Sequence, residues 1–193
     1  MKLSLKQGEQ LVKLARDSII SEFSKNKIIV PKGFEIERGV FVTLKNYPDE
    51  TLRGCIGFTY PFPLAEAIVK AAKLAAFEDI RFSPLKEEEI KNIIIEISIL
   101  TEPKEVKIKT EEDLKKIKIG EDGLIIQLDS LSGLLLPQVA VEEKWDAKTF
   151  IEHTCLKAGL GINAWKDPAT KVYKFQAQIF KEESPNGNVV EVK

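Results

Sequence analysis

The sequence is poor in cysteine and histidine. It holds only two cysteines, Cys55 and Cys155, and one histidine, His153. Two cysteines so far apart in the chain form neither a disulfide framework nor a zinc-ligand spacing. A single histidine also excludes a cluster of imidazole ligands. We therefore predict no metal site, and the sequence leaves open whether any cofactor is used.

Long apolar runs and blocks of like charge are also missing. No apolar run approaches the length of a membrane span, and the beginning "MKLSLKQGEQLVKLA" lacks the apolar region and cleavage site of a signal peptide. The 29 basic and 30 acidic residues leave a net charge of −1, whereas a nucleic-acid binder normally carries a basic face. We therefore expect a cytoplasmic protein with no membrane and no nucleic-acid partner.

The length and composition are those of a globular protein. The chain has 193 residues, of which 44% are apolar and 31% are charged. This length fits one domain, or one domain with a subdomain, and is enough to bury a proper core. Lysine, glutamate and isoleucine are frequent and Met1 is the only methionine, which is a thermophile-like composition.

Three stretches predict helices. A capping box that begins at Ser4 predicts a helix to about Lys25. Pro63 suits the first position of a second helix, and Asp146 suits the cap of a third, which Gly159 would end. The second helix carries small residues that let it lie close to a sheet: Ala67, Ala71, Ala72, Ala75 and Ala76.

Alternating apolar residues predict several strands. Residues 39–46 and the stretch "TLRGCIGF" form a hairpin around a turn at 47–50, and 92–100 form a further strand. A second hairpin surrounds "SLSG", and 172–180 form a last strand with one face made of Tyr173, Phe175, Ala177 and Ile179. Because strands come mostly in hairpins with helices inserted between them, we predict an α+β fold.

Several blocks, in this order, carry a family resemblance: "GVFVTL", "LRGCIG", "DIRFSPL", "IEISIL", "IGEDGLII", "LLLPQVA" and "KWD". Together they resemble the AMMECR domain family, whose hallmark hexapeptide is "LRGCIG". The resemblance covers about 4–184, which we predict to be the domain, and leaves 185–193 as a flexible tail.

The resemblance has consequences for fold and function. It implies a two-layer α/β sandwich with a mainly antiparallel sheet, divided into a larger and a smaller subdomain whose boundaries the sequence does not fix. It also implies that the hexapeptide lies at a groove between the subdomains, where a binding or active site is suspected. No reaction is established for the family. Memo-type and radical-SAM proteins are the partners that the resemblance implies.

The hexapeptide itself predicts a site. Strand alternation places Arg53, Cys55 and Gly57 on one face, and Gly54 and Ile56 on the other. A guanidinium beside a thiol lowers the thiol pKa, and the missing side chain at Gly57 leaves room for a ligand. The structural alternative is a buried cysteine, glycines that allow close packing against the alanine-rich helix, and an arginine paired with an acid.

A second candidate is "EDIRFSP" at 78–84. Asp79 and Arg81 supply a carboxylate and a guanidinium, while Phe82 anchors the turn. The structural alternative is an Asp–Arg pair that fixes a loop after a helix. A catalytic Cys–His pair would have to join Cys55 to His153, and because the family pattern requires no histidine there, we interpret His153 as an ordinary surface or half-buried residue.

Two functions remain open at this point. The first is a binding or accessory module that presents a groove to a small molecule or a partner protein; its binding residues are Arg53, Gly54, Ile56, Gly57, Arg81 and Phe82. The alternative is an enzyme that acts on a small anionic substrate, with Cys55 as thiolate nucleophile, both arginines as anion ligands, and Asp79 orienting the substrate or exchanging a proton. The sequence shows no general base near the cysteine, which favours the first. Homo-oligomerisation stays open.

Overall fold

The computed structural model describes residues 2–24 and 26–192. Lys25, at the end of the predicted first helix, and Lys193, at the end of the predicted tail, lie outside the described residues. The chain divides into two compact units. The first and larger unit comprises Met1–Leu100 with Gln178–Lys193, and the second comprises Thr101–Ala177. Within the described part of the chain, no helix combines the length and the apolar character that a membrane crossing requires.

The first unit is built on a five-stranded sheet with the spatial order β2-β1-β3-β8-β9. Strand β1 runs antiparallel to both β2 and β3, and β8 runs antiparallel to β9. The strands are β1 Glu37–Asn46, β2 Leu52–Pro63, β3 Ile93–Leu100, β8 Ala177–Glu182 and β9 Val189–Val192. The predicted hairpin of β1 and β2 and the predicted strand β3 are thus confirmed, and β2 lies at an edge of the sheet.

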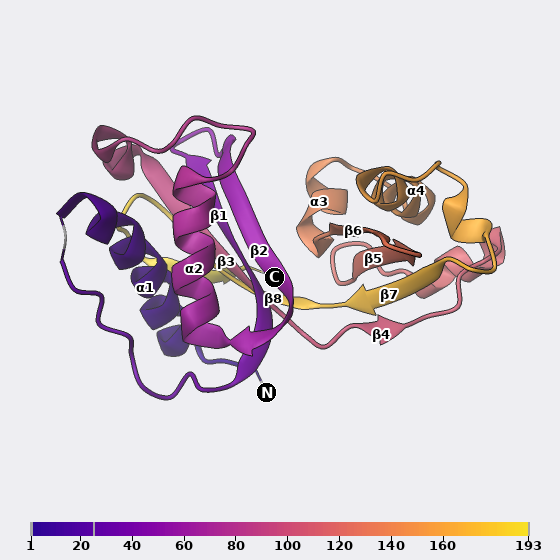
Figure 1. Ribbon diagram of the computed structural model, residues 1–193, viewed down its shortest axis with the longest axis horizontal. Helices are drawn as coiled ribbons and strands as arrows, with labels where there is room; N and C mark the ends of the chain where they lie inside the picture. The colour runs from indigo at the N-terminus through magenta and orange to yellow at the C-terminus, as the bar shows by residue number, and fades with distance from the viewer. Residues whose placement is uncertain (1, 25, 193) are drawn as a thin grey trace. The chain divides into compact units, whose positions relative to one another are not determined.

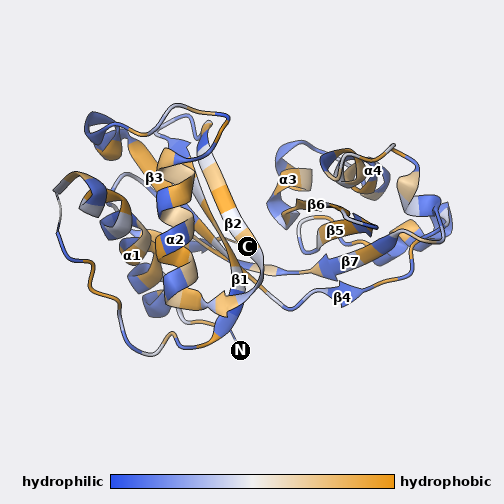
Figure 2. Cartoon of the chain, in the orientation of Figure 1, coloured by the Kyte–Doolittle hydropathy of each residue, from blue (hydrophilic) through white to orange (hydrophobic). Residues whose placement is uncertain are grey.

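Helices α1 (Leu5–Ser24) and α2 (Leu64–Phe77) pack together on this sheet (Figure 1). The predicted capping box is present, because the Ser4 amide donates to Gln7 Oε1 at 2.9 Å and the Gln7 amide donates back to the serine hydroxyl. All five alanines of the predicted small-residue surface of α2 are buried. Figure 2 shows hydrophobic and hydrophilic residues along both helices. In α1 the buried residues Leu11, Ala15 and Ile19 are four positions apart and therefore share one face of the helix.

The junction of β2 and α2 differs slightly from the prediction. The helix begins at Leu64, and Pro63 is the last residue of the strand that precedes it. Strand β2 therefore continues well beyond the predicted "TLRGCIGF". An edge strand tolerates Pro61 and Pro63 because it needs no amide donor on its open side, and this is why the prolines do not end the strand earlier.

The second unit holds a four-stranded sheet with the order β4-β7-β5-β6. Its strands are β4 Lys104–Glu105, β5 Gly123–Leu128, β6 Leu131–Leu135 and β7 Lys171–Phe175. Helix α4 (Ala147–Lys157) packs on β5 and β6, and the short α3 (Pro137–Glu142) contacts β5. The Asp146 cap is confirmed by a 2.8 Å bond from the Thr149 amide to its carboxylate, and Gly159 has a φ of +76° after the helix.

The prediction of one continuous last strand at 172–180 is wrong. This stretch forms two strands, β7 and β8, which belong to different sheets and meet at the exposed Gln176. At this residue both backbone groups bond to Thr101: the Thr101 amide donates to the Gln176 carbonyl, and the Gln176 amide donates to the Thr101 hydroxyl, each at 2.8 Å. The residue pattern alternates without interruption through this point, so the break has no local signal.

The predicted flexible tail also needs correction. Within 185–193, residues Val189–Val192 form β9, which pairs with β8 from Glu182↔Val189 to Ile179↔Val192. Val189 also packs against the core of the first unit. Valine favours extended structure, and an open edge of the sheet gives this segment a partner that the sequence alone does not reveal.

A buried ion pair ties α1 to the sheet of the first unit. Arg16 and Glu182 are 4% and 3% exposed, and Arg16 Nε donates to Glu182 Oε1 at 2.7 Å. Both side chains also make hydrogen bonds to the backbone of β3. Arg16 Nη2 donates to the Ile93 carbonyl, and Glu182 Oε2 accepts from the Ile95 amide, each at 2.8 Å. The pair therefore links α1, β3 and β8 with all its strong hydrogen-bonding groups satisfied.

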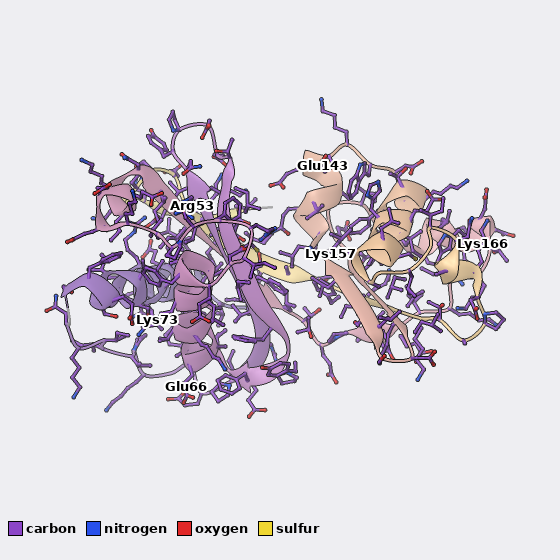
Figure 3. The ribbon with its side chains drawn as sticks, turned by 45° about the horizontal axis from the view of Figure 1, so that its top comes forward. Arg53, Glu66, Lys73, Glu143, Lys157 and Lys166 are labelled. Carbon is purple, nitrogen blue, oxygen red and sulfur yellow. The ribbon has the colours of Figure 1, made fainter. Side chains whose placement is uncertain are left out.

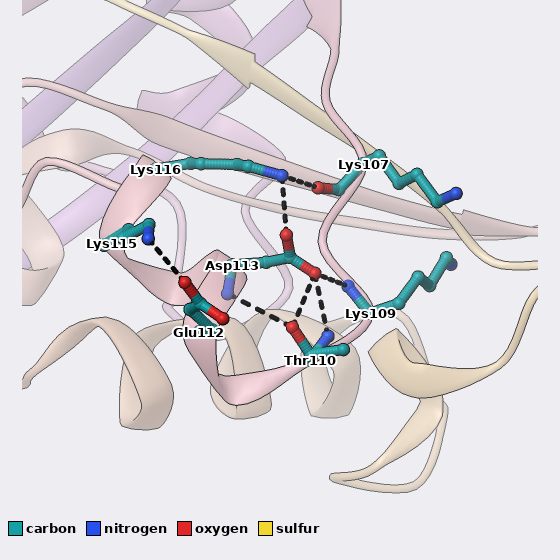
Figure 4. Close-up of polar contacts among 7 residues, drawn as sticks. All are labelled: Lys107, Lys109, Thr110, Glu112, Asp113, Lys115 and Lys116. Carbon is teal, nitrogen blue, oxygen red and sulfur yellow. Dashed lines mark hydrogen bonds and ion pairs between the residues drawn. The ribbon is translucent and has the colours of Figure 1, made fainter.

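The described residues also form three short 3₁₀ helices: η1 Glu87–Asn92, η2 Glu111–Lys116 and η3 Ala164–Lys166. Figure 4 shows how η2 is fixed: Thr110 and Asp113 cap one another, and Lys116 donates to the Asp113 carboxylate. The hydrogen bond from Lys116, with further bonds from Thr110 and the Lys109 amide, lowers the pKa of Asp113. The two lysines of this helix, Lys115 and Lys116, are thus each paired with a carboxylate, that of Glu112 and that of Asp113.

Candidate functional site

The residues of the hexapeptide alternate between the two faces of β2. Gly54 faces α2, since a Cβ built on it would lie 2.2 Å from the Ala75 carbonyl oxygen, and Ile56 packs against the same core. Gly57 lies on the other face, directly opposite Phe41 of β1. By alternation Arg53 and Cys55 share that second face, as the sequence indicates.

The two glycines serve close packing. At Gly54 the backbone of α2 comes so near that no side chain fits, which agrees with the predicted close approach of the alanine-rich helix. At Gly57 an added Cβ would lie 2.3 Å from the Val40 carbonyl oxygen and 2.4 Å from the Phe41 ring. The expectation that Gly57 leaves room for a ligand is therefore wrong: the aromatic ring on the neighbouring strand fills that room.

Arg53 is held by an acid that lies far along the chain. Its Nε and Nη2 donate to the two carboxylate oxygens of Glu89 at 2.9 and 3.2 Å, and Nη2 also donates to the Ser83 carbonyl at 3.0 Å. The residue is 8% exposed; Figure 3 labels it in the first unit. Its charge is thus directed to η1 and the preceding loop, as the structural alternative for this arginine expects, and not to the thiol.

Asp79 and Arg81 form a second pair of the same kind. Asp79 is 5% exposed; it accepts from Arg81 Nε at 2.9 Å and from Arg81 Nη2 at 2.7 Å. These bonds, with the amides of Cys55 and Arg81, lower the pKa of Asp79 to about 2. The carboxylate is therefore ionised at neutral pH, and it serves as an anchor for its neighbours.

This pair also completes the open edge of β2. The Cys55 amide donates to Asp79 Oδ2 at 2.9 Å, and the Cys55 carbonyl accepts from Arg81 Nη2 at 3.2 Å. One carboxylate and one guanidinium thus replace the hydrogen bonds that a neighbouring strand would make at this residue. The arrangement protects the edge strand and fixes loop 78–84 directly to the hexapeptide.

Cys55 is half-buried and its thiol is shielded from ionisation. Thr43, its partner on β1, donates from Oγ1 to Cys55 Sγ at 3.3 Å. Burial raises the pKa of the Cys55 thiol, and the favourable effects of Thr43 and Arg81 do not reverse this. The expectation that Arg53 lowers the thiol pKa is not met, because the guanidinium is paired with Glu89. The thiol is therefore protonated at neutral pH.

The site contains polar residues that sequence reasoning missed. Thr43 of β1 lies opposite Cys55 of β2 on one side and opposite Glu96 of β3 on the other. The three residues therefore form one row across the sheet. Glu96 is 5% exposed and lies 3.4 Å from the buried Lys45. A signal existed for Glu96, since it is the one charged residue of a strand whose other residues are apolar except for Ser98. Glu89, the partner of Arg53, had no such signal.

Loop 78–84 is a tight turn with one apolar side chain at its tip. The Phe82 amide donates to the Asp79 carbonyl at 3.0 Å, and Ile80 between them is fully exposed. The Phe82 ring lies 5.9 Å from the Arg53 guanidinium and 5.5 Å from that of Arg81. Because both ends of the loop are bonded to charged pairs, Ile80 and Arg81 are presented in a fixed position.

The remaining candidates lie in the second unit. His153 is exposed and stacks on Trp145 with the ring centroids 4.0 Å apart, in agreement with its interpretation as a surface residue. Cys155 is fully buried, and burial raises its pKa. Among the residues that the structure describes, no three His, Cys, Asp or Glu side chains are grouped as a metal would require.

The pH dependence of stability tests the anchoring role of Asp79. Its pKa is about 2 in the fold against 3.8 ordinarily, so the stability it contributes is complete above pH 3.8 and is lost as the pH falls through about 2. We expect this contribution to be about 2 kcal/mol. Urea unfolding of the wild type and of Asp79→Asn at mildly acidic and strongly acidic pH measures it. Equal losses in the two proteins would contradict the assignment.

The fold and this arrangement define an α+β protein with two antiparallel sheets and a buried, charge-paired region around an edge strand. A family model described as AMMECR1 matches residues 12–180. Protein MK0488 of Methanopyrus kandleri is 49% identical over 197 residues, which cover 98% of this chain and 95% of that protein. Protein PF1979 of Pyrococcus furiosus is 50% identical over 192 residues, with 94% and 91% covered.

A solved structure agrees with these relatives. The crystal structure of the uncharacterized protein PH0010 from Pyrococcus horikoshii has a TM-score of 0.93 and 46% identity, and the match covers 100% of this chain and 99% of that one. The chain belongs to the AMMECR1 family. The names of these relatives state no activity.

Proposed function

We propose that this chain is a cytoplasmic binding or accessory module, whose binding surface is formed by the hexapeptide strand and loop 78–84. The observation that carries the proposal is a pair of hydrogen bonds made by the backbone of Cys55. Its amide donates to Asp79 and its carbonyl accepts from Arg81, which fixes the loop on the strand. A fixed loop loses little conformational entropy on binding. Arginine and aromatic side chains, as found at Arg81 and Phe82, are also frequent at binding hot spots.

An enzyme with Cys55 as nucleophile is the alternative. It requires a thiolate, and the raised pKa of Cys55 disfavours one at neutral pH. It also requires a base, whereas Asp79, with a pKa of about 2, is too weak to accept a proton efficiently. The charged groups of this region are paired with one another, which suits recognition better than proton transfer.

The proposed partners are those that the family resemblance implies, a Memo-type protein and a radical-SAM protein. Arg81 is the residue through which to test them, because its side chain is 45% exposed, whereas Arg53 is buried and its loss would disturb η1. Arg38 is the matched control, since it is a half-buried arginine of β1 whose side chain donates to the neighbouring Glu37 carbonyl and, within the described residues, makes no ion pair.

The experiment is quantitative capture of purified Memo-type and radical-SAM proteins from the source organism by wild type, Arg81→Gln and Arg38→Gln. We expect Arg81→Gln to weaken capture by about tenfold, as loss of a hot-spot arginine does, and Arg38→Gln to leave it unchanged. Equal capture by all three proteins would count against this surface as the docking site.

A further inference from the structure

We propose that Arg53 and Arg81 together bind a carboxylate group of a small-molecule ligand beside the Phe82 ring. This inference rests on the proposed binding function of the same surface and specifies the chemistry of its ligand. It is carried by the hydrogen-bonding groups that the two arginines leave unused, and by the position of both guanidiniums against one aromatic ring.

The two arginines make the same kind of pair. Arg53 presents Nε and Nη2 to both oxygens of Glu89, and Arg81 presents Nε and Nη2 to both oxygens of Asp79. A guanidinium is a planar fork with donors on two edges. Since each carboxylate occupies one edge, both pairs leave the same atom, Nη1, without a carboxylate partner.

The unused donor of Arg53 is the stronger indication. The residue is only 8% exposed and its Nη1 is buried. This atom nevertheless has no hydrogen-bond partner among the residues that the structure describes. A buried donor of a charged group without an acceptor is costly, and native proteins rarely leave one. A ligand oxygen that reaches Nη1 as the half-buried Phe82 side chain turns, while the loop backbone keeps its hydrogen bonds, would remove this cost.

Arg81 offers a second donor that solvent already reaches. Its side chain is 45% exposed, and within the described part of the chain its hydrogen bonds use Nε and Nη2 only. Because both guanidinium carbons lie within 6 Å of the Phe82 ring centroid, a ligand on that ring is near both arginines. The ring also provides an apolar contact for the carbon part of the ligand.

The charges of the site select the kind of anion. Arg53 and Arg81 are balanced by Glu89 and Asp79, and Glu87 and Glu88 precede Glu89 in η1. A site of this balance gives a dianion such as phosphate no advantage, while the planar fork of arginine fits a carboxylate well. We therefore expect a single carboxylate to bind more tightly than phosphate.

The test is titration of the full chain with ¹³C-acetate, followed by NMR, and with inorganic phosphate. We expect saturable acetate binding that weakens about tenfold in Arg81→Gln, the loss of one charge-assisted pair, and that Arg38→Gln leaves unchanged. Arg53→Lys keeps the charge and removes the forked donors, and it should weaken acetate binding to a similar degree. If Arg53→Lys does not fold, acetate binding by Arg81→Gln alone tests the inference.

Three results would overturn the inference: no saturable acetate binding by the wild type, equal affinity in Arg81→Gln, or tighter binding of phosphate than of acetate. These failures are distinguishable from failure of the proposed function. If acetate does not bind but Arg81→Gln still loses partner capture, the surface is a protein-docking site and only the ligand assignment falls. If capture is unaffected by Arg81→Gln, the docking function falls, whatever the acetate result.

Discussion

Glu182→Ala is expected to destabilise the first unit by about 3–5 kcal/mol, the usual cost of leaving one charge of a buried ion pair uncompensated. Arg16 would keep its bonds to the Ile90 and Ile93 carbonyls but lose both bonds to the carboxylate. The Ile95 amide in the middle of β3 would lose its acceptor as well. Chemical unfolding followed by circular dichroism measures the loss.

An exposed ion pair on the same helix provides the control. Lys13 and Asp17 are spaced i,i+4 on α1, and their side chains are 73% and 44% exposed. Asp17→Ala should therefore cost no more than about 0.5 kcal/mol. A loss below about 1 kcal/mol for Glu182→Ala, comparable to a surface substitution, would contradict the role assigned to the buried pair.

Gly54→Ala is expected to cost about 3 kcal/mol or more, at the upper end of the range for overpacked cores. The added Cβ would lie 2.2 Å from the Ala75 carbonyl oxygen, and backbone of a packed helix cannot move aside as a flexible side chain does. Any shift of this end of α2 also displaces Asp79, which follows the helix directly. The hydrogen bond from the Cys55 amide to Asp79 should therefore weaken together with the fold.

Gly161 is the matched control for this substitution. Nothing lies within 4 Å of a Cβ added there, and its φ is not in the left-handed region. Gly161→Ala should be neutral or stabilise the protein by about 0.4–1 kcal/mol, because it restricts the unfolded chain. If both alanine variants unfold at the same denaturant concentration, the close approach of α2 to β2 is not what Gly54 provides.

Local patterns predicted most elements of the fold. The capping box at Ser4, the cap at Asp146 and the alternation of β1 and β3 each depend on residues a few positions apart, so the sequence contains the whole signal. The alanine-rich face of α2 was predicted for the same reason. The family resemblance added the position of the site, which composition and periodicity did not provide.

Long-range pairing could not be predicted in the same way. Arg53 and Glu89 are separated by 36 residues, and several acids of η1 were equally suitable partners. The pairing of β9 with β8 and the transfer of the chain between sheets at Gln176 also depend on where open edges lie in space. Gly57 is a clear example: strand alternation gives its face, but only the cross-strand neighbour Phe41 shows that the space is filled.

These observations change the interpretation of the hexapeptide. Its glycines are required for packing, its arginine holds η1 and its cysteine provides a backbone anchor for loop 78–84. We infer that the exposed part of the binding surface lies on the loop, at Ile80 and Arg81. The thiol of Cys55 is part of the support of this surface.

The rate of Cys55 alkylation as a function of pH tests this account most directly. Native protein is treated with iodoacetamide from neutral to alkaline pH, and the modified residue is located by mass spectrometry. Because burial raises the thiol pKa, we predict slow alkylation that increases only above the ordinary thiol pKa of about 8.5, with buried Cys155 reacting only after unfolding. Fast alkylation of Cys55 at neutral pH, with an apparent pKa below about 7, would contradict the account and favour a catalytic thiolate.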